Sequence, residues 1–214
     1  MIMKKKNIVL LVLAVILLEN VTVNQEVALA DTQQLSQTTE QSIPNVDPNI
    51  AKTAEQMLGY FSYGQVRPVQ NYVTKPGHQL NTVDDVDPNG TTDCSGFVWL
   101  TLKVSGYNVG GFPAGSTENM KHLDGGWGNV LEEIPQNQAQ PGDIVVVSAS
   151  MADGGHTGIL DGSYNGNDLV NSDTPFINVS DGPAERGPIK NYFATLKYFA
   201  PVHVYRANPS AKVN

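Results

Sequence analysis

The chain contains a single cysteine, Cys94, within the run Asp-Cys-Ser-Gly-Phe-Val at residues 93–98. A polar turn precedes this cysteine, and an apolar helical pattern follows it as far as Gly106, a residue type that often ends helices. A thiol in the first turn of a helix faces unsatisfied backbone N–H groups and the positive end of the helix dipole, which favour the thiolate. Cys94 is therefore a candidate nucleophile, and the alternative is a small buried apolar side chain.

A cysteine nucleophile needs a base that takes its proton and returns it to the leaving group. The chain offers four histidines, at positions 78, 122, 156 and 203. His156 differs from the others because Gly154, Gly155 and Gly158 surround it, which lets another segment approach its backbone closely. We therefore predict that His156 is the base, with a purely structural histidine as the alternative.

A third polar group should hold the base in the correct orientation. If the strand that carries His156 turns and returns through residues 168–171, Asn171 lies beside His156 and its amide oxygen accepts from the imidazole. Asp173 is the competing candidate. We prefer Asn171 because it continues the alternation of the expected strand, whereas Asp173 stands in turn-like sequence.

The elements that position these residues change in type along the chain. Helical patterns come first, an amphipathic one from Asp47 to Phe61, then the cysteine helix, then a short one near residues 116–123. Strand-like segments follow, at 144–147, 154–160, 168–171, 176–179 and 202–205. This order predicts an α+β domain with an antiparallel sheet. The irregular stretch 62–93 is a candidate wall of a binding cleft.

The N-terminal segment of the chain predicts export. Three lysines precede an apolar run too short for a comfortable membrane span, and Ala28-Leu29-Ala30 matches a signal-peptidase site. We expect a signal peptide at 1–30, a disordered Gln/Thr/Ser-rich spacer at 31–46, a catalytic domain at 47–208 and a tail at 209–214. A membrane-anchored N-terminus is the alternative. After signal cleavage we expect a secreted protein without stable membrane insertion, free or associated with a cell wall.

The net charge of the chain argues against one class of binding partner. The chain carries a formal net charge of −8, and without residues 1–30 it has 10 basic and 19 acidic residues. An acidic surface argues against nucleic acid as a partner. A lone cysteine outside the cytoplasm either pairs with another chain or reacts.

Three motifs in this order resemble the NlpC-type papain-like cell-wall hydrolases: residues 93–98, Pro-Gly-Asp-Ile-Val-Val at 141–146 and Gly-His-Thr-Gly-Ile at 155–159. The chain is most similar to the phage-type peptidoglycan amidases of that superfamily. That likeness adds Ser62-Tyr63, the run Ser-Thr-Glu-Asn-Met at 116–120, Gly-Gly-His-Thr-Gly at 154–158 and the closing Val-Tyr-Arg at 204–206. The resemblance covers roughly residues 50–207.

The resemblance implies a papain-like fold, with N-terminal helices packed on a small antiparallel sheet. It implies Cys94 as nucleophile, His156 as base and acid, and Asn171 as the third residue, where many relatives have histidine. It further implies that Tyr63 shapes the oxyanion site together with the backbone N–H of Cys94. For Tyr63, a packed aromatic side chain is an equal alternative.

The acidic segment before the cysteine partly matches a calcium loop. Asp85, Asp87 and Asn89 have the spacing of its first half, but the glutamate required at the twelfth position falls on Gly96. Some related hydrolases bind calcium just ahead of their cysteine, so calcium stays an alternative to a solvated acidic turn. We expect no metal and no cofactor.

These patterns together predict a secreted, monomeric thiol hydrolase whose partner is peptidoglycan. We expect it to cut an amide bond, either between muramic acid and L-alanine or within the stem peptide. The alternatives are a non-catalytic secreted protein that binds a wall or a host surface, and an antibacterial toxin with an inhibitor or immunity protein as partner.

Overall fold

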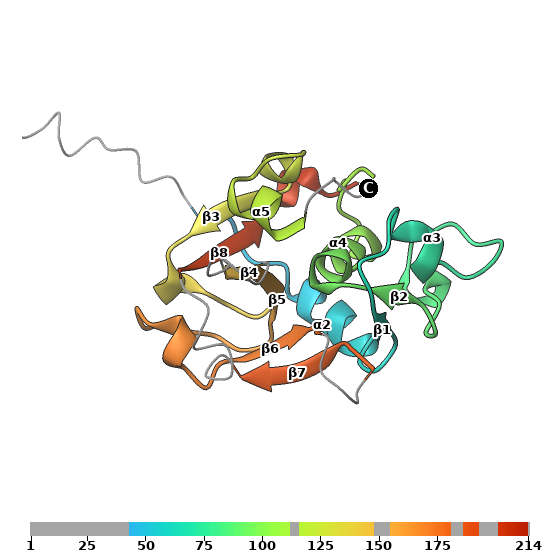
Figure 1. Ribbon diagram of the computed structural model, residues 1–214. Coiled ribbons are helices and arrows are strands. Elements are labelled where there is room, and N and C mark those ends of the chain that lie inside the picture. Colours follow the sequence, from blue (N-terminus) through green and yellow to red (C-terminus); the bar gives the residue numbers. More distant parts are fainter. Residues whose placement is uncertain (1–42, 112–115, 148–154, 181–185, 193–200, 214) are drawn as a thin grey trace, which may run out of the picture. The chain divides into compact units, whose positions relative to one another are not determined.

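The computed structural model describes residues 43–111, 116–147, 155–180, 186–192 and 201–213 (Figure 1). The expected signal peptide and most of the expected spacer lie outside these residues. The chain divides into two units, 1–42 and 43–214, and only the second contains described residues. No helix in these described ranges is both long and apolar enough to cross a membrane.

A six-stranded antiparallel sheet forms the second half of the domain, in the order β3-β8-β4-β5-β6-β7. Its strands are β3 (Leu131–Ile134), β4 (Ile144–Val147), β5 (His156–Leu160), β6 (Pro175–Asn178), β7 (Ile189–Tyr192) and β8 (Val202–Ala207). The uninterrupted apolar run of β4 is buried throughout, as expected for a central strand covered on both faces. The predicted α+β class with an antiparallel sheet is confirmed.

Helices pack on one face of this sheet, α2 (Pro48–Gln56), α4 (Cys94–Val104) and α5 (Ser116–Lys121) (Figure 1). Apolar side chains of α2 and α4 form one buried cluster with Ile144, Val146 and Ile159 of the sheet. The opposite face, with Val145 and Leu160, forms a second cluster beneath the segments around residues 139 and 169. The sheet is therefore the central layer, and α4 lies directly against β5.

The stretch 62–93 is less irregular than expected. It contains β1 (Ser62–Tyr63), α3 (Gln70–Val73), a single 3₁₀ turn at Val83–Asp85 and β2 (Thr91–Thr92). Strands β1 and β2 pair in parallel, with Ser62 opposite Thr91 and Tyr63 opposite Thr92. This pairing closes a long loop immediately before the cysteine helix.

The expected strand at 168–171 is wrong. Residues Leu169–Asn171 form a 3₁₀ turn whose Leu169 side chain enters the second apolar cluster. The apolar pair Leu169-Val170 is too short to distinguish a strand from a packed turn, and β5 instead pairs with β6. The sheet also contains β3 and β7, which the sequence did not predict.

Both ends of the domain extend beyond the expected boundaries. Ile43 packs on the second apolar cluster, and the carbonyl oxygen of Pro44 accepts a 3.0 Å hydrogen bond from Arg206. At the other end, Lys212 bridges to Tyr107 and its ammonium lies 2.7 Å from the Asp47 carboxylate. Part of the expected spacer and most of the expected tail therefore contact the domain.

Candidate active site

Cys94 is the first residue of α4, as the sequence predicts. Asp93 caps this helix because its Oδ1 accepts the Gly96 N–H at 2.7 Å and the Ser95 hydroxyl at 2.9 Å. Its Oδ2 lies 2.7 Å from the guanidinium of Arg67. Asp93 is only 4 % exposed, so Arg67 supplies the counter-charge that a buried carboxylate requires.

The first turn of α4 packs closely against β2. A Cβ atom on Gly96 would lie 2.3 Å from the Thr92 hydroxyl oxygen and 3.0 Å from a methyl carbon of Val69. A side chain at position 96 would therefore push the helix start away from β2. This close approach explains why position 96, two residues after the cysteine, is a glycine. It also fixes the start of the helix, and with it the thiol, relative to β2.

The thiol is buried against the sheet. The backbone N–H groups of Thr157, Ser95 and Cys94 favour the Cys94 thiolate. Burial opposes them and raises the pKa of Cys94 to about 12, with the nearby Asp93 carboxylate adding to the rise. The helix start thus acts as the sequence predicts, but desolvation outweighs it and the resting thiol is neutral near pH 7.

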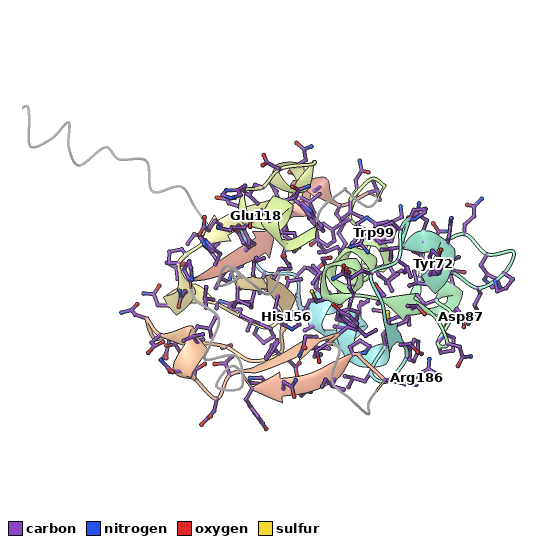
Figure 2. The ribbon with its side chains drawn as sticks, in the orientation of Figure 1. Tyr72, Asp87, Trp99, Glu118, His156 and Arg186 are labelled. Carbon is purple, nitrogen blue, oxygen red and sulfur yellow. The ribbon has the colours of Figure 1, made fainter. Side chains whose placement is uncertain are left out.

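His156 opens β5 (Figure 2) and directly precedes the residue whose N–H reaches the Cys94 sulfur. Its Nε2 lies 3.0 Å from Oδ1 of Asn178 on the neighbouring strand β6. An amide oxygen can only accept, so this bond places the proton on Nε2 and makes Nδ1 the basic nitrogen. The edge of the Phe176 ring also contacts the imidazole, with ring centroids 6.5 Å apart.

The His156–Asn178 contact follows from the register of β5 and β6. Ile159 lies opposite Ile177, so Gly158 faces Asn178 and His156 lies diagonally across from it. Residues at this diagonal are within reach when the side chains are long. Gly158 carries no side chain, and the amide of Asn178 passes over it to the imidazole.

The structure does not bring Asn171 to His156. The Asn171 amide is exposed and donates a 2.7 Å hydrogen bond to Asp168 within the 3₁₀ turn, and the competing candidate Asp173 is exposed as well. The residue that contacts the imidazole is Asn178, which the sequence analysis missed. A signal was present, because Asn178 is the polar residue within the apolar run Phe-Ile-Asn-Val at 176–179.

The fold brings the backbone of Tyr63 near the start of the cysteine helix. Its strand pairing with Thr92 puts its backbone beside the residue two positions before Cys94, although thirty residues lie between Tyr63 and Cys94 in sequence. The Tyr63 side chain is 38 % exposed. Its role at an oxyanion site stays a prediction.

The three other histidines have carboxylate partners outside this cluster. His78 lies 3.0 Å from Asp85, His122 lies 2.9 Å from Glu118, and His203 lies 2.8 Å from Glu133. Each of these three histidines thus has a carboxylate partner, and none of these pairings involves Cys94.

The segment considered for calcium is folded on itself. The Asp85 carboxylate caps a 3₁₀ turn by accepting from the N–H groups of Asn81 and Thr82, and these bonds together with His78 lower its pKa. Asp87 accepts from the N–H of Asn89 at 2.9 Å. In the part of the chain that the structure describes, no group of three or more His, Cys, Asp or Glu side chains could hold a metal ion.

The fold and this cluster define an α+β protein with a buried cysteine at a helix start, set against a histidine–asparagine pair on a sheet. Residues 75–170 match a family described as bacteriophage peptidoglycan hydrolase. The matched segment contains Cys94 and His156, whereas Tyr63 and Asn178 lie outside it. The match confirms the predicted resemblance to phage-type peptidoglycan hydrolases over this segment. A search of curated proteins found no match.

Proposed function

We propose that this protein is an exported cysteine amidohydrolase that cuts an amide bond of peptidoglycan. One observation carries the proposal. The backbone N–H of Thr157 favours the Cys94 thiolate, and the imidazole of the preceding residue, His156, lies 3.0 Å from the Asn178 amide oxygen. This arrangement supports Cys94 as the nucleophile, His156 as the base and Asn178 as the group that orients the base.

The resting protonation states define the first chemical step. Burial keeps the Cys94 proton on the sulfur at neutral pH. Asn178 holds the other imidazole proton on Nε2, so Nδ1 of His156 accepts the thiol proton as the sulfur attacks the carbonyl carbon. The tetrahedral oxyanion that forms is stabilised by backbone N–H groups at the start of α4, where the helix dipole is positive.

Collapse of the tetrahedral intermediate breaks the C–N bond. The His156 imidazolium returns its proton to the departing amine, which leaves as a neutral group, and the acyl group stays on the sulfur as a thioester. A water molecule then gives a proton to His156 and attacks the thioester carbonyl. This second step releases the acid and restores the Cys94 thiol.

We place the scissile bond between the lactyl group of muramic acid and L-alanine, because the chain resembles phage-type amidases. An amide bond inside the stem peptide is the alternative. The two assignments differ in their products, since an amidase releases intact stem peptides and an endopeptidase releases shortened ones.

Digestion of purified peptidoglycan, followed by mass spectrometry of the soluble products, tests the proposal. We expect wild type to release intact stem peptides, and Cys94→Ala and His156→Ala to release none. The matched control is His122→Ala, because His122 is an exposed histidine on the helical side of the domain that pairs with Glu118. It should behave as wild type. Shortened stems would indicate an endopeptidase.

Alkylation of the thiol by iodoacetamide gives a second, independent readout. We expect His156→Ala to slow alkylation of Cys94 near neutral pH, because the imidazole no longer accepts the proton. Equal alkylation rates in wild type and His156→Ala, together with an undigested wall, would contradict the catalytic proposal. A protein that only binds the wall would then be the better assignment.

A further inference from the structure

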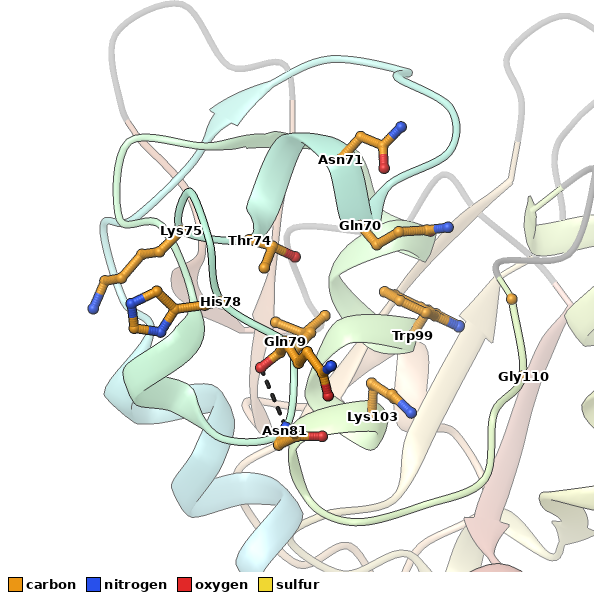
Figure 3. Close-up of a pocket in the computed structure, with 12 residues that line it drawn as sticks. Gln70, Asn71, Thr74, Lys75, His78, Gln79, Asn81, Trp99, Lys103 and Gly110 are labelled. Carbon is orange, nitrogen blue, oxygen red and sulfur yellow. Dashed lines mark hydrogen bonds between the residues drawn. The ribbon is translucent and has the colours of Figure 1, made fainter.

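A polar hollow of about 550 Å³ lies beside α4, between this helix, α3 and the segment that follows α3 (Figure 3). Its volume is within the range of pockets that hold small ligands. The residues that define its chemistry are Gln70, Asn71, Gln79, Asn81, Trp99 and Lys103. None of the cluster around Cys94 and His156 lines it.

The hollow has a different charge from the rest of the chain. The protein is acidic overall, with a formal charge of −8, yet no aspartate or glutamate lines this hollow. The lining carries the two lysines Lys75 and Lys103. Lys75 donates to the Asp84 carbonyl oxygen at 2.6 Å, whereas half-buried Lys103 forms no ion pair within the described residues. A ligand with a negative group would satisfy the Lys103 ammonium.

The remaining polar lining consists largely of side-chain amides. Gln70, Asn71, Gln79 and Asn81 each carry both donors and acceptors, the pattern that matches the N–H and C=O groups of a peptide. The Gln70 Oε1 atom is buried and accepts no hydrogen bond from any described residue. An N–H group of a bound peptide would satisfy it.

The hollow is separate from the thiol. Lys103 follows Cys94 by nine residues on α4, which is about half a turn around the axis after two full turns, so the two side chains leave opposite sides of the helix. The nine residues also separate them by about 14 Å along the axis. A ligand in the hollow therefore occupies a different place from the bond under attack.

We propose that this hollow binds a carboxylate-bearing stem peptide of peptidoglycan and thereby holds the hydrolase on its substrate. The negative group contacts Lys103, and the peptide amides contact the glutamine and asparagine side chains. The inference rests on the proposed function only in taking the wall peptide as the ligand. It adds a second contact with the wall on the catalytic domain itself.

Binding is measured by calorimetry with the Cys94→Ala protein, which cannot consume the ligand. The probe is a soluble stem peptide with its glutamyl α-carboxylate either free or converted to the amide. We expect Lys103→Gln to weaken binding of the free carboxylate about tenfold, the loss typical of one charge-assisted hydrogen bond. Amidation of the peptide should cause a similar loss, and the two losses should not add.

Two further variants keep the test specific. Lys52→Gln is the matched control, because Lys52 is an exposed lysine on α2 away from the hollow, and it should bind as the parent does. Gln79→Glu places a carboxylate at the exposed edge of the hollow and should weaken the free carboxylate more than the amidated peptide. Thermal melting of each variant shows that its fold is intact.

Equal affinities of Lys103→Gln and Lys52→Gln would overturn the proposal, as would absence of peptide binding. These results are distinguishable from failure of the proposed hydrolysis. If wild type leaves the wall intact but binding depends on Lys103, the hollow is a wall-peptide site without the proposed chemistry. If wild type cuts the wall and Lys103 has no effect, only the inference about the hollow fails.

Discussion

Gly158 and Asn178 face each other across β5 and β6 so closely that a Cβ atom on Gly158 would lie 3.1 Å from the Cβ of Asn178. The same atom would lie 2.7 Å from the Ile177 carbonyl oxygen. The absence of a side chain at this one position lets two strands approach and brings an amide onto the imidazole of His156. The geometry of the candidate site thus depends on a residue that performs no chemistry itself.

Replacing Gly158 with alanine should therefore destabilise the domain. Overpacking of this kind reduces the free energy of unfolding by about 1–3 kcal/mol, measured by urea denaturation. Gly111→Ala is the control, because nothing lies within 4 Å of a Cβ atom at that position, and it should stay close to wild type. Equal stability of the two variants would show that β5 and β6 separate without cost.

Asn178→Ala should lower kcat for wall digestion by at least about tenfold, because the imidazole then loses the group that holds its tautomer and orientation. Asn171→Ala is the matched control, since Asn171 is exposed and bonds only within its own turn. It should retain wild-type activity. A larger loss in Asn171→Ala than in Asn178→Ala would favour Asn171, the residue predicted from the sequence, as the third residue of the site.

The raised pKa of Cys94 predicts a pH dependence of stability. An unfolded thiol has a pKa near 9.0, and the folded value is about 12, so above pH 9 the unfolded chain releases a proton that the folded chain keeps. The stability of wild type should therefore fall relative to Cys94→Ala as the pH rises from 9 towards 12, by up to about 1.4 kcal/mol per pH unit.

Urea denaturation of both proteins at pH 8, 9, 10 and 11 measures this difference, because other groups titrate equally in the two chains. Parallel stability curves would show that the folded thiol ionises as easily as the unfolded one. The buried, neutral thiol described above would then be incorrect.

A buried ion pair joins the closing strand to the turn before β4. Arg206 donates to both carboxylate oxygens of Asp143, at 2.8 and 2.7 Å, and both side chains are almost wholly buried. Arg206→Met leaves a buried carboxylate without a counter-charge and should cost about 3–5 kcal/mol of unfolding free energy. Lys121→Met, which breaks the largely exposed pair with Glu118, should cost no more than about 1 kcal/mol.

Thermal or urea denaturation compares these two variants directly. A loss in Arg206→Met no greater than that in Lys121→Met would mean that Asp143 becomes protonated or hydrated without disturbing the fold.

Local signals in the sequence were sufficient for the features that depend on neighbouring residues. The helix that begins at Cys94, its end near Gly106, the strand at 144–147 and the strand that carries His156 all follow from caps, apolar runs and turn residues a few positions apart. The order of helices before strands was enough to predict an α+β domain. The candidate cysteine and histidine could be singled out because each stands in an unusual local setting.

The tertiary structure decided what depends on strand register and burial. Asn178, not Asn171, meets His156 because β5 pairs with β6 after an intervening 3₁₀ turn, and the sequence carries no local record of that register. The Tyr63 backbone lies near the cysteine because of a parallel pairing with Thr92 across a long loop. The thiol is neutral because packing against the sheet removes it from water, and the free energy of that desolvation depends on atoms distant in sequence.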